Sequence, residues 1–137
     1  MFNWKDEYSC NVSEIDLQHK NLFELGNKLY TIVSLSQKYD RFDEIVKTLE
    51  ELRNYTIYHF EFEENLLKLH GYENIEEHKK QHEAFIKKVT SIDEEYMDLN
   101  QKKVSMDLLT FILDWIGNHI LKTDMGYKEF LNNKGIY

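Results

Sequence analysis

Apolar residues recur every three or four positions along most of this chain, which is the period of an amphipathic α-helix. We expect four long helices, over residues 13–37, 40–70, 74–96 and 106–122. Residues suited to cap a helix stand at the expected starts: Ser13, Asp40, Asn74 and Ser105. Gly71 is suited to stop the second helix, so the second and third helices form an antiparallel pair joined by a tight turn.

The two ends of the chain lack a long apolar stripe. Aromatic and apolar residues are unevenly spaced over residues 1–12, which indicates an arm that packs across the domain. Residues 125–137 are expected to form a short helical tail. The predicted fold is therefore all-α: an up-down-up-down antiparallel four-helix bundle with an N-terminal arm and a short C-terminal helix, in a single domain over residues 1–137.

Composition favours helices and excludes several kinds of partner. Proline is absent and only five glycines occur. The formal net charge of -8 argues against binding to nucleic acid or to an anionic membrane, because phosphate binding requires clustered basic residues. The sequence contains no secretory signal, no apolar run long enough to span a bilayer, and a single cysteine, Cys10. We expect a cytoplasmic protein, and a monomer rather than an oligomer.

Five of the six histidines fall on the inward faces of the expected helices: His19, His59, His78, His82 and His119. One inward histidine is usually a core residue that is hydrogen-bonded to a backbone carbonyl. Five without partners would cost about 1–3 kcal/mol each, against a domain stability of about 5–15 kcal/mol. A shared metal would satisfy all five together. His70 has no partner at ligand spacing, and we expect it to be exposed at a helix end.

Two carboxylates complete the candidate site. Glu63 follows His59 by one helical turn and shares its face, whereas Glu61 and Glu64 are expected to point elsewhere. Asp124 follows His119 by five residues, which on a regular α-helix places it about 140° away. The fourth helix must therefore tighten, bend or end between these two residues if Asp124 is to face inward.

The number and kind of donors indicate the metal. Five imidazoles and two carboxylates exceed the four ligands of structural zinc, and calcium prefers oxygen alone. Mixed nitrogen and oxygen donors favour two iron ions bridged by both carboxylates and by an oxo or hydroxo group, with a single position left open. The Glu-x-x-His pattern of ferritin-like proteins is absent, and a nitrogen-rich shell favours reversible binding of dioxygen.

The ordered donors resemble those of the hemerythrin family, and the chain is similar to its single-domain bacterial branch over residues 1–132. The donor pattern is His19, His59-x-x-x-Glu63, His78-x-x-x-His82 and His119-x-x-x-x-Asp124. Supporting stretches are Asn3-Trp4, Ile15-Asp16-x-Gln18-His19-Lys20, His59-Phe60-x-x-Glu63-Glu64 and Gly71-Tyr72. The resemblance implies a four-helix bundle with a non-haem di-iron centre.

The same resemblance assigns a role to each candidate residue. It implies that one iron is held by His78, His82 and His119, and that the other is held by His19 and His59 and keeps the open position. Glu63 and Asp124 would bridge the two ions. The residues expected to wall the oxygen pocket, or simply to pack in the core, are Phe60, Trp115, Ile116 and Ile120.

The predicted function is reversible binding of dioxygen, as a carrier, store, scavenger or delivery protein, rather than an enzyme. The chain continues only to residue 137 beyond Asp124, which favours these roles over an oxygen or redox sensor. A partner protein that supplies electrons or accepts oxygen is also expected. The alternatives are a di-iron oxidase or peroxidase, a nitric-oxide-reducing centre, or a bundle that holds zinc or serves only a structural role.

Overall fold

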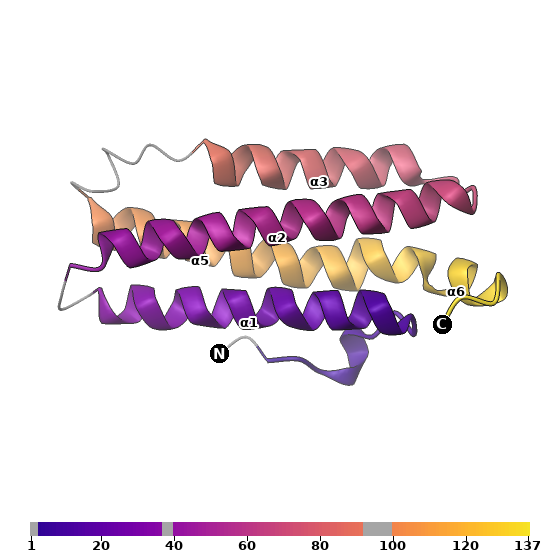
Figure 1. Cartoon of the computed structure of the whole chain (residues 1–137), viewed down its shortest axis with the longest axis horizontal. Helices are drawn as coiled ribbons and strands as arrows, with labels where there is room; N and C mark the ends of the chain where they lie inside the picture. Colours follow the sequence, from indigo (N-terminus) through magenta and orange to yellow (C-terminus); the bar gives the residue numbers. More distant parts are fainter. Residues whose placement is uncertain (1–2, 37–39, 92–99) are drawn as a thin grey trace.

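The computed structural model of the chain describes residues 3–36, 40–91 and 100–137 (Figure 1). A short 3-10 helix, η1 (Asp6–Tyr8), precedes the first long helix. The long helices are α1 (Ser13–Leu35), α2 (Phe42–Leu69), α3 (Ile75–Thr90) and α5 (Gln101–Asn118). The chain then continues through the π-helix η2 (His119–Asp124) into α6 (Met125–Asn133).

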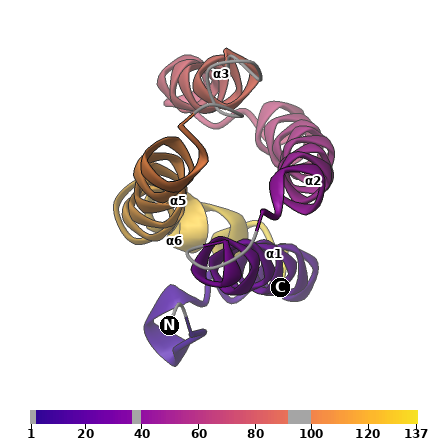
Figure 2. The ribbon, with the colours of Figure 1, turned by 90° about the vertical axis from the view of Figure 1, so that its left-hand side faces the viewer.

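The four long helices lie side by side, and each runs opposite to the one before it (Figure 1). Seen end-on, they surround a common axis in the order α1, α2, α3 and α5, with α6 at one end of the bundle (Figure 2). No strand occurs in the described ranges. The predicted all-α, up-down-up-down bundle with an N-terminal arm and a C-terminal helix is confirmed.

The starts of the helices differ in detail from the prediction. Ser105 was expected to cap the fourth helix, but α5 begins four residues earlier, at Gln101. Ser105 is buried inside α5, and its hydroxyl donates to the backbone carbonyl of Gln101. The prediction was wrong because a serine that bonds back to the preceding turn has the same sequence signal as a cap. The expected end of the third helix, residues 92–96, lies outside the described residues.

Two buried apolar clusters hold the bundle together. The larger one includes Leu22 on α1 and Phe60 on α2, together with apolar residues of α3 and α5. The smaller one lies towards α6 and includes Ile15 and Leu67. His19 stands between Ile15 and Leu22 in the sequence of α1, so the inward histidines lie where the two clusters meet.

The N-terminal arm packs on the outside of α1. The ring of Trp4 lies 5.4 Å from that of Phe23, and the ring of Tyr8 lies 4.9 Å from it, both in edge-on geometry. The Asp16 carboxylate accepts hydrogen bonds from the backbone N–H of Cys10 at 2.8 Å and from the hydroxyl of Ser9 at 2.5 Å. These contacts fix the end of the arm against the first turn of α1.

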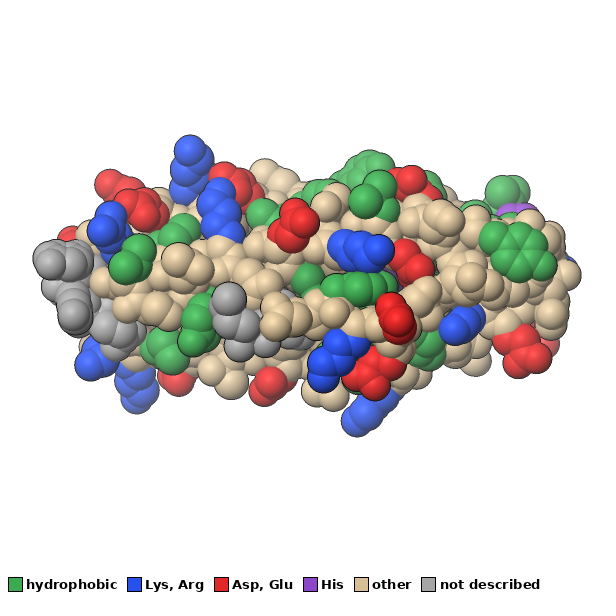
Figure 3. All heavy atoms as spheres, turned by 90° about the horizontal axis from the view of Figure 1, so that it is seen from below, with side chains coloured by type: hydrophobic (Ala, Val, Ile, Leu, Met, Phe, Trp, Pro, Cys, Tyr) green, Lys and Arg blue, Asp and Glu red, His purple; other side chains and the backbone are tan. Residues whose placement is uncertain are grey.

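Charged side chains of both signs are interspersed on the face seen in Figure 3. Apolar side chains occur among them in small groups. None of the helices in the described part of the chain is long and apolar enough to cross a membrane.

Candidate metal centre

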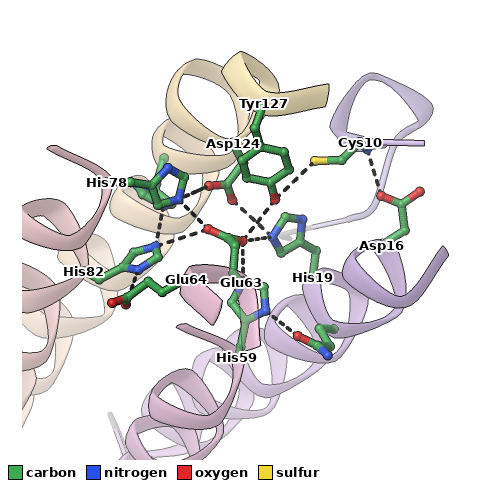
Figure 4. Close-up of polar contacts among 12 residues, drawn as sticks. Cys10, Asp16, His19, His59, Glu63, Glu64, His78, His82, Asp124 and Tyr127 are labelled. Carbon is green, nitrogen blue, oxygen red and sulfur yellow. Dashed lines mark hydrogen bonds and ion pairs between the residues drawn. The ribbon is translucent and has the colours of Figure 1, made fainter. Parts of the chain in front are cut away.

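All seven side chains that were predicted as metal ligands meet inside the bundle. Figure 4 labels six of them, all except His119. The seven side chains come from α1, α2, α3 and η2, and η2 directly continues α5, so all four rods of the bundle contribute. Each is buried, with exposed fractions between 0 and 5%. The seven residues are His19, His59, Glu63, His78, His82, His119 and Asp124.

The donor atoms form two overlapping groups. One group contains Glu63, His78, His82, His119 and Asp124, and its donor atoms all lie within 4.8 Å of one another. The other group contains His19, His59, Glu63 and Asp124, within the same distance. The two carboxylates belong to both groups, while each histidine belongs to one. The arrangement therefore has the connectivity of two cation sites that share their carboxylates.

Two of the helices present their donors at the spacing of one turn. On α2, the Nε2 atom of His59 lies 3.2 Å from Oε2 of Glu63, four residues later. On α3, the rings of His78 and His82 are 4.6 Å apart between centroids. Gly71 has a φ of +75° between these helices, a conformation that glycine adopts easily and that ends α2. The turn there lets α3 return along α2 and face its donors.

The π-helix η2 brings Asp124 to the site. Hydrogen bonds in a π-helix run between residues five apart, so His119 and Asp124 are separated by one turn and share a face. His119 Nε2 lies 3.0 Å from Asp124 Oδ1. The sequence predicted a change in the helix here but named the wrong one: the turn widens rather than tightening or bending, and the chain continues into α6 instead of ending.

The inward nitrogen and oxygen atoms of the cluster lie close together, and several of them lack hydrogen-bond partners among the described residues. This geometry fits a metal. His19 Nε2 lies 3.1 Å from Asp124 Oδ2, yet neither atom has a hydrogen-bond partner among the described residues. His82 Nε2 and His119 Nε2 face each other at 3.1 Å. Two imidazole nitrogens at this distance need a proton or a cation between them. A nitrogen and carboxylate donor set suits a transition metal.

Without a metal, protons take the place of the cations. Burial works against protonation of His78, but the carboxylates of Asp124 and Glu63 outweigh it and raise its pKa to about 10. Burial also works against the charged Glu63, but the imidazoles of His59, His19 and His78 hold its pKa well below the ordinary range. Burial lowers the pKa of His59, although the nearby Glu63 carboxylate acts in the opposite direction. The cluster can therefore exchange protons for cations.

The outer ring nitrogens of His59 and His119 are held by glutamine side chains. Gln18 Oε1 lies 2.7 Å from Nδ1 of His59, and Gln81 Oε1 lies 2.9 Å from Nδ1 of His119. The hydroxyl of Thr123 donates to the same oxygen of Gln81 at 2.7 Å. An acceptor at Nδ1 keeps the proton there and leaves Nε2 free to bind a metal.

His82 has a charged acceptor in the same role. Glu64 Oε2 lies 2.9 Å from His82 Nδ1. Glu64 was expected to point away from the site, and for the interior of the cluster this is correct. The expectation missed that a side chain leaving the side of α2 can reach α3. This contact lies between helices, so the spacing within one helix does not report it.

Two further residues beside the cluster were not singled out as part of it. The hydroxyl of Tyr127, on α6, donates to Glu63 Oε2 at 3.0 Å. Cys10 is fully buried, and its sulfur lies 3.8 Å from that hydroxyl. Both reach the site from the ends of the chain, 117 positions apart, which no local pattern could indicate.

Of the four residues expected to wall an oxygen pocket, Phe60 and Trp115 stack on histidines of the cluster. The ring of Phe60 stacks on His82, with centroids 3.8 Å apart, and the ring of Trp115 stacks on His119 at 4.3 Å. Ile116 and Ile120 are both buried in the larger apolar cluster. These contacts cover the histidines of the five-donor group with apolar surface.

The cluster comes closest to solvent at His119, the most exposed of the seven residues at 5%. A surface hollow of about 530 Å³ lies there, lined by Trp115, His119 and Gln81 among others. His119 therefore borders both the hollow and the cluster. It is a candidate ligand, and its outer nitrogen Nδ1 is held by Gln81.

Fold and site together define a helical-bundle protein with a buried cluster of histidines and carboxylates that could hold cations. The family model described as "Hemerythrin HHE cation binding domain" matches residues 10–131. The chain belongs to the hemerythrin family.

Related proteins and structures cover nearly the whole chain. A bacteriohemerythrin of Clostridium acetobutylicum is 39% identical over 127 residues, which cover 93% of this chain and 98% of that protein. A bacteriohemerythrin of Methylococcus capsulatus is 31% identical, and 92% of each chain is covered. A crystal structure of wild-type hemerythrin superimposes with a TM-score of 0.77 at 28% identity, covering 94% of this chain and 96% of that one.

Proposed function

We propose that this chain binds dioxygen reversibly at a centre of two iron ions, as a carrier, store, scavenger or local donor of oxygen. The observation that carries the proposal is that two groups of buried donors share Glu63 and Asp124. Two ions bridged by two carboxylates account for this sharing, whereas a single zinc site would leave donors unused. The similarity to proteins named bacteriohemerythrin supports the same function.

Each donor has a role in this proposal. His78, His82 and His119 would hold one ion, His19 and His59 would hold the other, and the carboxylates of Glu63 and Asp124 would be shared by both. When bound, the ferrous pair supplies the electrons and the open coordination position at which dioxygen binds. His19 and His59 are one histidine fewer than the other group supplies, so the position would be open on their side.

The chain's own groups orient the donors and exclude water. Gln18, Gln81 and Glu64 hold the outer ring nitrogens, so the inner nitrogens need no reorganisation to bind a cation. The stacked rings of Phe60 and Trp115 keep water away from His82 and His119. A dry, nitrogen-rich surrounding favours the ferrous pair and slows its oxidation.

An oxidase or peroxidase would need a group that delivers protons to bound oxygen. The hydroxyl nearest the bridging carboxylate is that of Tyr127, and it already donates to Glu63. Burial, and then the nearby carboxylates, raise the pKa of Tyr127 well above its ordinary value, so it keeps its proton. A fixed donor of this kind supports binding rather than turnover.

The test begins with metal analysis of the purified protein. We expect about two iron atoms per chain and a coloured protein in air; one zinc per chain and no colour would overturn the proposal. The reduced protein is then mixed with dioxygen in a stopped-flow instrument. A stable adduct that releases its gas under vacuum supports reversible binding, whereas continuous consumption of oxygen with a reductant indicates an oxidase.

A further inference from the structure

The ring of His19 differs from those of His59, His82 and His119 in how its outer nitrogen is held. His59, His82 and His119 each have a side-chain acceptor at Nδ1. His19 is fully buried, and its Nδ1 has no hydrogen-bond partner of good geometry among the described residues. Buried N–H groups in folded proteins are almost always paired, so the surroundings of this atom must contain its acceptor.

Cys10 and Asp16 are the candidate acceptors beside His19. Cys10, Asp16 and His19 each have one nitrogen, oxygen or sulfur atom that lies within 4.8 Å of the corresponding atoms of the other two. Both oxygens of Asp16 are already engaged, Oδ1 by the backbone N–H of Cys10 and Oδ2 by the hydroxyl of Ser9. These bonds direct the carboxylate of Asp16 towards the arm, and the sulfur of Cys10 accepts no other hydrogen bond among the described residues, so we take it as the acceptor.

The position of Cys10 is fixed from two sides. On the side of α1, Asp16 holds its backbone N–H. On the side of α6, the Nδ2 group of Asn132 donates to the backbone carbonyl of Asn11 at 3.1 Å. Asn11 itself has a φ of +52°, a turn that lets the chain reverse direction just after Cys10. The sulfur is therefore held against the site by the backbone on both sides.

The hydrogen bonds around the sulfur run in one direction. The thiol of Cys10 donates to the oxygen of Tyr127 at 3.8 Å, and the hydroxyl of Tyr127 donates to Glu63 Oε2 at 3.0 Å (Figure 4). Because the single hydrogen of the Tyr127 hydroxyl goes to Glu63, the Cys10 sulfur is the donor in its bond to Tyr127. Its lone pairs stay available to an N–H group that approaches from His19.

We propose that Cys10 is a positioning residue, whose sulfur accepts the Nδ1–H of His19 and thereby holds Nε2 of that ring towards the shared carboxylates. Cys10 then joins a histidine to a bridging carboxylate through Tyr127. This inference rests on the proposed di-iron centre, because His19 is assigned there to the ion with the open position. The N-terminal arm thus becomes part of the site rather than a cover for the bundle.

The test uses the holoprotein loaded with ⁵⁷Fe, in the wild type and in Cys10→Ala, Cys10→Ser and Val12→Ala. Val12 is the matched control, because it is buried in the same apolar cluster and its truncation also removes volume there. In Cys10→Ala, we expect release of one iron to a chelator to be about ten- to a hundredfold faster, as for other lost partners of metal-binding histidines. The Mössbauer signal of one of the two iron sites should change and the other should not.

Cys10→Ser keeps an acceptor on a shorter bond, so its release rate should lie between those of the wild type and Cys10→Ala. Val12→Ala should lower the melting temperature without changing the spectrum of either iron. Wild-type spectra and release rates in both Cys10 variants would overturn the inference. A wild-type protein with fewer than two irons, or without reversible oxygenation, would instead overturn the proposed function, so the two failures are distinguishable.

Discussion

His78 and His70 lie eight positions apart but in different surroundings. His78 is buried between Glu63 and Asp124, whereas His70 caps the end of α2, where it is only partly covered. We expect His78→Ala to lose iron and to lower the free energy of unfolding by about 3–5 kcal/mol, because the truncation removes a partner shared by two buried carboxylates. His70→Ala should change neither. Iron content and urea unfolding measure both effects, and loss of iron from His70→Ala would refute the ligand assignment.

The residues of the site were predictable to the extent that they share a helical face. Histidines and acids four apart on one helix must lie together, so His59 with Glu63 and His78 with His82 could be read from spacing. Their role as iron ligands remains a prediction. Contacts such as that of Glu64 with His82 depend on how two helices are placed, which no single stretch of sequence specifies.

At the scale of elements, the wide turn of η2 determines whether Asp124 can join the cluster. Deleting the exposed Leu121 would leave His119 and the aspartate four apart, and a regular α-helix would still place both on one face. Inserting one alanine after Leu121 would instead turn the aspartate about 100° away. We expect the deletion variant to retain most of its iron and the insertion variant to lose it.

Iron per chain, measured after gel filtration, tests this pair of variants, and far-UV circular dichroism serves as the control that both are folded. Equal iron content in the two variants would show that Asp124 is dispensable. The long helices themselves were predictable because their apolar period is clear, but their ends were not. Ser105 illustrates why: its hydroxyl bonds inside α5, and the half-buried Val104 before it extends the apolar stripe.

At the scale of the whole molecule, the buried cluster should make the stability of the metal-free protein decrease both as the pH rises and as the pH falls. The pKa of His78 is raised to about 10 and that of His19 well above its ordinary value of 6.5, in each case by carboxylates that outweigh burial. The stabilisation that comes from a raised histidine pKa is complete below the ordinary pKa. It is lost as the pH rises towards the pKa that the histidine has in the folded protein. Asp124 and Glu63 have lowered pKa values, so their stabilisation is lost as the pH falls.

The free energy of unfolding of the iron-stripped protein should therefore decline between about pH 6.5 and 10, by up to about 1.4 kcal/mol per pH unit for each such histidine. Bound iron replaces these protons, so the loaded protein should not show this decline and should release protons when it takes up metal. Urea unfolding of both forms at several pH values measures the difference. A stripped protein that is equally stable at pH 6 and pH 9 would mean that the histidines carry no protons in the folded state, and that the cluster is not held together by charge in the absence of metal.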